Sequence, residues 1–198
     1  MTIAIGKRRV PITVSVYFVG MAAFCFAAGS VGKISLGLLF AGLHELGHLG
    51  AMAAFRARPQ RVCLTVAGMR IDRPPGLSLS FAQEIIIAFA GPAVSLILAG
   101  LFGALTIVNC QLSILYDCAA INLGFALFNL LPVRQLDGGR ALYYSLCRRL
   151  NETAAEHICL GVSLLCLFVI TASAAFMCLR YGLNLPLVVA VIYLALNC

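Results

Sequence analysis

The sequence predicts an all-α polytopic membrane protein with about six transmembrane helices, a small β-hairpin on the cytoplasmic side and a re-entrant loop. Of its 198 residues, 62% are hydrophobic and 11% are charged, and the mean hydropathy index is +1.02. An ordinary soluble domain has about 25% charged residues and could not bury this much apolar surface. The apolar residues form long runs, whereas a transmembrane barrel has short alternating segments. A soluble enzyme, a disordered tail and a secreted disulfide scaffold are thereby excluded.

Six apolar runs predict the transmembrane helices, since a helix needs about 20 residues to cross a bilayer. The last run is the shortest and contains Pro186. Capping-box pairs, Ser80 with Gln83 and Thr153 with Glu156, predict where the third and fifth helices begin. The six predicted spans are residues 13–31, 34–55, 83–107, 113–131, 155–179 and 183–197.

The basic residues predict the orientation, because cytoplasmic loops of membrane proteins are rich in Lys and Arg. With a cytoplasmic amino terminus, only Lys33 and Arg180 fall on the outer side. This bias predicts a multi-pass protein of the cell membrane with both termini in the cytoplasm. It also accounts for the net charge of +7 without a nucleic-acid partner. The cytoplasmic side would hold Lys7, Arg8, Arg9, Arg56, Arg58, Arg61, Arg70, Arg73, Arg134, Arg140, Arg148 and Arg149.

Two segments between the predicted helices are expected to form structure other than a transmembrane helix. Residues 61–72, RVCLTVAGMRID, are rich in β-forming residues and predict a hairpin that turns near Gly68. Residues 132–151 contain no full-length apolar run and predict a re-entrant or interfacial segment. No composition shift marks a separate soluble domain, so residues 1–198 are expected to form a single domain.

The second predicted span contains the sequence His44-Glu45-Leu46-Gly47-His48. Histidines four residues apart share one face of a helix, so both imidazoles can bind one Zn²⁺ while Glu45 serves as general base for a water molecule. Hydrogen bonding within a His–Glu cluster is the plainer alternative. Ionisable residues are costly at mid-membrane, however, and three of them in five positions favour a catalytic zinc site.

A catalytic zinc site commonly has three protein ligands, so one further residue is required. Asp72, Asp117 and Asp137 are the candidates. Asp117 falls on the outer side, and Asp72 lies between two arginines as a solvated charge would. Asp137 follows the cytoplasmic end of the fourth span, and the two glycines after it permit a tight backbone. Asp137 is the preferred third ligand, with one Zn²⁺ per chain.

The motifs together resemble those of the site-2 protease family of intramembrane zinc metallopeptidases. HELGH lies in one predicted span, and Asn129-Leu130-Leu131-Pro132 and Leu136-Asp137-Gly138-Gly139 follow about ninety residues later. Ala90-Gly91-Pro92 is similar to the Gly-Pro motif of that family. The compact form is most similar to the sporulation-type branch (stage IV sporulation), which processes a membrane-associated precursor of a sigma factor. Neither a PDZ domain nor the CBS domain common in that branch is expected.

The resemblance implies a role for each site residue. His44, His48 and Asp137 would bind zinc, and Glu45 would move the proton from water to the leaving amine. Asn129 would contact the substrate backbone or the developing oxyanion, with a helix-end hydrogen bond as its alternative. The family has a second proline just before its LDG motif, where this chain has Arg134 and Gln135.

The predicted function is therefore an intramembrane zinc metalloendopeptidase that cleaves a membrane-associated precursor, such as a pro-sigma factor, near the cytoplasmic face. Its expected partners are that protein substrate, a regulatory membrane protein and the lipid bilayer. The 61–72 hairpin could hold an extended substrate segment along its edge. Two alternatives use the same zinc site: a metal transporter or sensor, and a non-catalytic membrane scaffold. A transporter would repeat polar ligands along its path, and the other predicted spans have few.

Overall fold

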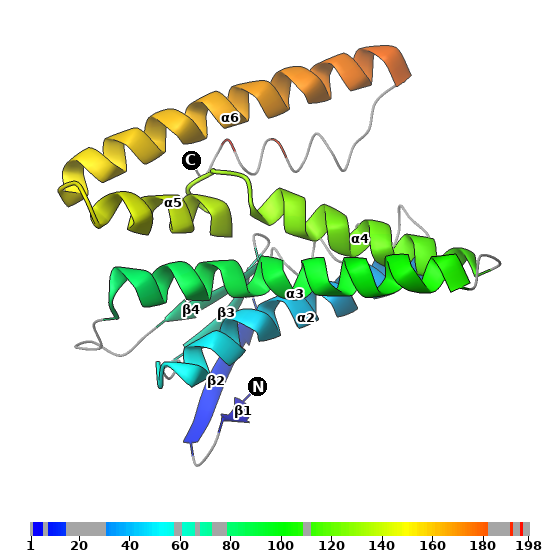
Figure 1. Ribbon diagram of the computed structural model, residues 1–198, viewed down its shortest axis with the longest axis horizontal. Helices are drawn as coiled ribbons and strands as arrows, with labels where there is room; N and C mark the ends of the chain where they lie inside the picture. The colour runs from blue at the N-terminus through cyan, green and yellow to red at the C-terminus, as the bar shows by residue number, and fades with distance from the viewer. Residues whose placement is uncertain are drawn as a thin grey trace.

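Five helices and four strands make up the described part of the chain (Figure 1). The computed structural model describes residues 2–5, 8–14, 31–57, 61–65, 68–72, 79–108 and 112–181, together with residues 191 and 195. The helices are α2 (Val31–Ala54), α3 (Phe81–Val108), α4 (Ser113–Asn129), α5 (Asp137–Cys147) and α6 (Glu152–Tyr181). Four of them coincide closely with the second to fifth predicted spans.

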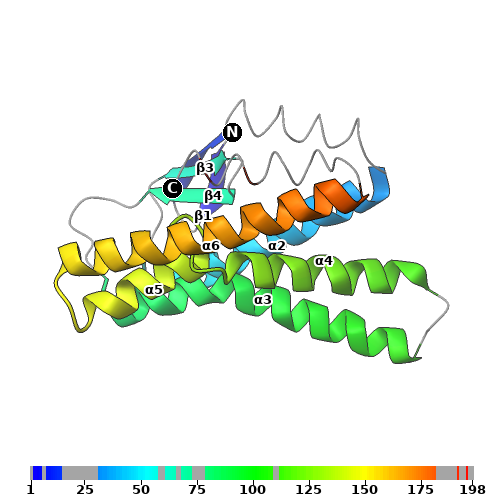
Figure 2. The same ribbon diagram turned by 90° about the horizontal axis from the view of Figure 1, so that it is seen from above.

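The helices pack mainly as neighbours in sequence, with α3 at the centre. Helix α3 packs against α2, α4 and α5, and α6 packs against α5. Figures 1 and 2 show α6 crossing over the molecule on the side of α5 that faces away from α2. Helix α5 thereby lies between α3 and α6. Its first residue, Asp137, lies beside α2.

Within the part of the chain that the structure describes, two helices are long and apolar enough to cross a membrane: Phe81–Val108, and residues Glu152–Arg180 of α6. Helix α4 is apolar but shorter. Large side chains such as Ile97 of α3 and Phe168 of α6 are exposed, as the lipid-facing residues of membrane helices are. The predicted spans 13–31 and 183–197 lie almost entirely outside the described residues. Residues 13 and 14 belong to a strand, so the first span cannot begin at residue 13.

The strands form one sheet in the order β1-β2-β3-β4. Strands β3 (Arg61–Thr65) and β4 (Gly68–Asp72) are antiparallel, with Thr65 opposite Gly68. Two amino-terminal strands that the sequence did not predict, β1 (Thr2–Ile5) and β2 (Arg8–Val14), extend this pair. Strand β2 runs parallel to β3 and antiparallel to β1. Strand β4 lies at the end of the order and contacts α2.

The helix starts test the two predicted capping boxes. The first is confirmed: Gln83 N–H donates to Ser80 Oγ at 3.3 Å, and Ser80 N–H donates to Gln83 Oε1 at 2.9 Å. The second is wrong, because α6 begins earlier and Ala154 N–H donates to Asn151 Oδ1 at 2.9 Å. Asparagine is as good an N-cap as serine, and it lies directly before the first residue of the helix.

Helix α2 ends in a turn that needs no glycine. Arg56 has a φ of 56°, and Ala57 N–H donates back to the Met52 carbonyl at 2.8 Å. This is the hydrogen-bond pattern of a Schellman motif, which usually places glycine at the left-handed position. The side chains of Met52 and Ala57 are buried with Ile87 of α3 and compensate for the strain at Arg56. The cluster fixes α2 against α3 one turn beyond His48.

Candidate metal centre

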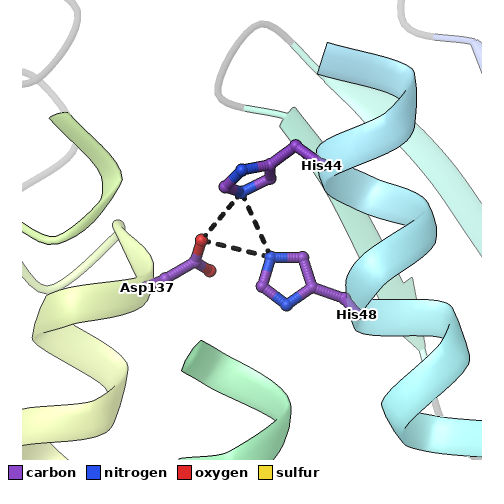
Figure 3. A group of neighbouring side chains, drawn as sticks. All are labelled: His44, His48 and Asp137. Carbon is purple, nitrogen blue, oxygen red and sulfur yellow. Dashed lines mark hydrogen bonds and ion pairs between the residues drawn. The ribbon is translucent and has the colours of Figure 1, made fainter. Parts of the chain in front are cut away.

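Three buried side chains from two distant parts of the chain converge on one point. His44 and His48 project from α2, and Asp137 is the first residue of α5. Figure 3 shows the two imidazoles and the carboxylate pointing toward one another. The Nε2 atoms of His44 and His48 are each 3.1 Å from Asp137 Oδ2, and they are 3.3 Å from each other. In the described part of the chain, these residues form the one group of metal-ligand type.

The spacing of the three donor atoms fits a zinc ion. Ligand atoms about 2.0–2.1 Å from a tetrahedral zinc ion are separated from one another by about 3.3 Å. The three observed separations lie at or just below this value. Two imidazoles and one carboxylate are also a donor set that zinc accepts in catalytic sites. The residues present therefore fit the metal that the HELGH motif predicts.

Hydrogen bonds on the far side of each imidazole orient the rings. His48 Nδ1 lies 2.7 Å from the carbonyl oxygen of Ile87 in α3. Because a carbonyl can only accept, Nδ1 carries the proton and Nε2 keeps a lone pair for a metal. His44 Nδ1 lies 2.9 Å from the hydroxyl oxygen of Ser95, which is fully buried in α3. Ser95 is therefore the hydrogen-bond partner that orients the His44 ring, and sequence analysis did not single it out.

Gly91 keeps space open beside the imidazoles. A Cβ atom at this position would collide with Nε2 of His48 and lie 2.6 Å from Nε2 of His44. A side chain there would fill the space where the three donor atoms meet. Any residue larger than glycine at position 91 would therefore enter the candidate metal centre.

The approach of α2 to α3 depends on a second small residue. A Cβ at Gly47 would lie 2.7 Å from the backbone oxygen of Ala90 and 2.9 Å from a side-chain carbon of Val94. Gly47 lies between the two histidines in sequence, so the helices meet most closely at the level of the site. Close approach through small residues is typical of helix packing in membranes.

Asp137 reaches the histidines because α5 packs tightly on the loop before it. A Cβ at Gly138 would collide with the Leu130 carbonyl, and one at Gly139 would collide with the Val133 carbonyl. The two glycines are thus explained by close packing against backbone atoms. Asp137 lies outside the predicted spans. Burial alone would raise the pKa of its carboxyl group, but when His44 and His48 are protonated on both ring nitrogens, their hydrogen bonds and charge outweigh burial and hold the pKa at about 2.

The other acidic candidates for the third ligand are placed differently. Asp117 of α4 forms an ion pair with Lys33 at 2.9 Å, at the opposite end of α2 from His48. Asp72 is the last residue of β4. Among the side chains that the structure describes, the group that could hold a metal contains Asp137 and not Asp117.

Glu45 and Asn129 stand outside the three-residue group. Glu45 is half-buried and directly follows His44, so it lies near the histidine face of α2. Asn129, the last residue of α4, donates from Nδ2 to the Phe125 carbonyl at 2.9 Å. This is the helix-end hydrogen bond that was the alternative to a substrate contact. The amide still has a second N–H and an oxygen that this bond does not use.

Comparisons with known proteins find similarity to one peptidase family and to bacterial relatives. Residues 106–170 match the family model described as peptidase family M50. A protein of Mycobacterium tuberculosis named Rip3, whose name places it among zinc metalloproteases, is 47% identical over a 124-residue alignment that covers 58% of this chain and 31% of that protein. Stage IV sporulation protein FB of Bacillus subtilis is 27% identical over 147 residues, which are 73% of this chain and 50% of that protein.

The fold resembles that of a protease whose structure has been solved. The site-2 protease from Methanocaldococcus jannaschii superposes with a TM-score of 0.66 at 22% identity, over 98% of this chain and 92% of that one. The chain spans about a third of the length of Rip3 and half of the sporulation protein. The segment that matches the family model contains Asp137, and the solved structure shares the fold of this chain.

Proposed function

We propose that this chain is a zinc endopeptidase of peptidase family M50 (the site-2 proteases) and that it cleaves a membrane-associated protein. The observation that carries the proposal is the convergence of His44, His48 and Asp137, with Glu45 on the same helix. The first three residues would hold the metal. Zinc bound there would supply a Lewis acid that activates water and polarises the scissile carbonyl.

Glu45 would handle the proton in this reaction. Its carboxylate would accept a proton from the attacking water and deliver it to the nitrogen of the departing amine as the peptide C–N bond breaks. His44 and His48 would each keep Nε2 unprotonated for the metal. A hydrogen-bond partner on the Nδ1 side would hold each ring in place. Asn129 would use its remaining amide N–H on the substrate backbone or the developing oxyanion.

A membrane setting accords with the long apolar helices α3 and α6. We extend this to six spans, both termini in the cytoplasm and one domain over residues 1–198, as the charge distribution predicts. His48 lies toward the carboxyl-terminal end of α2, and the Lys33–Asp117 pair lies toward the other end. In this orientation the metal centre faces the cytoplasmic half of the bilayer, where water has a short route to it.

The strand order offers a place for an extended substrate. A peptide bond inside a helix is shielded by the turns around it, so the substrate must unwind before cleavage. Strand β4 ends the sheet order and contacts α2, which carries the HELGH motif. An unwound segment could add to β4 through main-chain hydrogen bonds.

A proline scan tests strand addition. In a strand that pairs on one side, every second N–H points away from the partner. Proline is therefore substituted in turn at Met69, Arg70 and Ile71. Cleavage should be impaired more where the lost N–H faces the substrate than where it faces β3, so strong and weak effects should alternate along the strand. Equal effects at all three positions, matched by equal losses of stability, would argue against strand addition.

The substrate class follows from the site and the relatives together. A buried metal centre beside membrane helices suits a protein held at the membrane, and one relative is named as a sporulation protein. We propose a membrane-associated precursor of a transcriptional regulator, such as a pro-sigma factor, as the substrate. A membrane protein that restrains the enzyme would then be a further partner.

Co-expression with candidate precursors tests the proposed function. Wild type should release a shorter product, whereas Glu45→Gln should bind zinc normally and cleave at least about 100-fold more slowly, because the general base is lost. A transporter or sensor would bind zinc without cleaving any precursor, and a scaffold would bind precursors equally well in both forms. Normal cleavage by Glu45→Gln would contradict the proposed mechanism.

A further inference from the structure

The loop between α4 and α5 is fastened to α6 by one hydroxyl group. Arg134 N–H donates to Ser163 Oγ at 3.0 Å, and this hydroxyl donates to the Pro132 carbonyl at 3.3 Å. Both bonds reach backbone groups about thirty positions away in the sequence. Ser163 is fully buried. Its hydroxyl thus joins two points of the loop to a helix that crosses above it (Figure 2).

The fastened loop leads directly into the metal centre. Asp137 lies only three positions after Arg134, and Leu136 between them packs with Val133 against Leu167 of α6. On the other side of the loop, Gly139 of α5 lies close to the Val133 carbonyl. The chain just before Asp137 is therefore held between two helices, and Ser163 supplies the directional contact from α6.

Ser163 differs from its surroundings on α6. Many of its neighbours along the helix are large, apolar and exposed, such as Leu164 and Leu165. A buried hydroxyl costs free energy unless it is hydrogen-bonded, so an apolar residue would be the default here. Ser173 provides a contrast, because its hydroxyl donates to the Val169 carbonyl of its own helix at 2.8 Å.

A second link between the loop and α6 is weaker. The guanidinium group of Arg134 forms an ion pair with Glu156 at 2.6 Å, and both side chains are about half exposed. Exposed ion pairs contribute little in water. The backbone bonds to the buried hydroxyl are the better candidates for fixing the loop.

We propose that Ser163 is a positioning residue for the metal centre. Its hydroxyl fixes the path of the backbone between Pro132 and Arg134 and thereby directs the Asp137 carboxylate toward His44 and His48. The inference rests on the proposed function in one respect, namely that Asp137 ligates zinc. It adds α6, which contributes no ligand to the group, to the parts of the chain on which zinc affinity depends.

A matched pair of substitutions tests this role in the full chain purified in detergent. Ser163→Thr keeps the hydroxyl, and Ser163→Val introduces a side chain of the same shape as threonine but without the hydroxyl. Competition with a chromophoric chelator gives the dissociation constant for zinc. We expect Ser163→Val to bind zinc about 10- to 100-fold more weakly, as is typical when a group that orients a ligand is lost, and Ser163→Thr to remain close to wild type.

Two controls separate the hydroxyl of Ser163 from other effects. Ser173→Val removes a hydroxyl of the same helix that bonds only within α6, and Arg134→Ala removes the ion pair but keeps the backbone N–H. Both should bind zinc as wild type does. The visible spectrum of the Co²⁺-loaded protein gives a second readout, which Ser163→Val should alter and Ser163→Thr should preserve.

A double-mutant cycle links the effect to Asp137. If Ser163 acts through that carboxylate, Ser163→Val should cause no further loss of zinc affinity in an Asp137→Ala background. A further loss there, or wild-type zinc affinity of Ser163→Val, would overturn the proposal while leaving the proposed function intact. Failure of Ser163→Val to fold while Ser163→Thr folds would assign Ser163 to the fold and would also overturn it. Absence of zinc binding by wild type would instead overturn the proposed function itself.

Discussion

A methyl group added to the Cα atom of Gly91 would collide with Nε2 of His48, although the two residues lie on different helices. Helix α3 thus leaves space for the metal centre, and it also provides the hydrogen-bond partners that orient both imidazoles. The site is built from three helices: α2 and α5 carry the ligands, and α3 shapes the volume between them.

Gly91→Ala is therefore expected to weaken zinc binding by at least about 100-fold, because the new methyl group occupies the space in front of two ligand atoms. The zinc dissociation constant of the purified protein measures this loss. Gly100→Ala is the matched control, since it lies on the same helix and a Cβ there meets nothing within 4 Å. Equal zinc affinity of the two variants would show that α3 does not approach the site as closely as described.

Ser95→Ala should lower zinc affinity by about 10- to 100-fold, because His44 loses the partner that orients its ring. Ser95→Thr retains a hydroxyl and should recover part of the affinity. Thr106→Val serves as control, since it removes a hydroxyl of α3 that bonds to the Gly103 carbonyl, far from the site. A Ser95→Ala protein with unchanged zinc affinity would mean that His44 needs no such support.

The start of α6 gives a test of stability that does not involve zinc. Asn151→Ala should lower the free energy of unfolding by about 1 kcal/mol, because the N–H of Ala154 loses its cap. Thr153→Ala should have little effect, although the sequence places Thr153 in a capping-box pattern. Thermal unfolding of both variants in the same detergent measures the difference. A larger loss from Thr153→Ala would return the cap to the position predicted from sequence.

The parts of the molecule that sequence predicted well depend on local geometry. The spacing of His44 and His48 fixes their common face on any helix, and the glycines after Asp137 mark a tight approach of the backbone. Ser95 and Ser163 could not be found in this way. A serine in an apolar helix carries no periodic signal, and its importance depends on which distant backbone or imidazole lies opposite.

The amino-terminal strands were missed for a related reason. Lys7, Arg8 and Arg9 match the basic flank of a transmembrane helix, so the residues after them were assigned to the first span. The structure instead places Arg8–Val14 in β2, where Ile12 pairs with Val62 of β3. The pairing partner lies fifty residues away, and no local pattern indicates it. Contacts between distant segments decide both this strand and the two serines.

Zinc content of the detergent-purified protein tests the central claim most directly. Elemental analysis of wild type, His44→Ala and Asp137→Ala should give about one zinc per chain in the first and far less than one in the other two, as expected for a site with three protein ligands. Retention of zinc by Asp137→Ala alone would place the third ligand elsewhere. Absence of zinc from wild type purified without chelators would contradict the metal centre and the peptidase mechanism built on it.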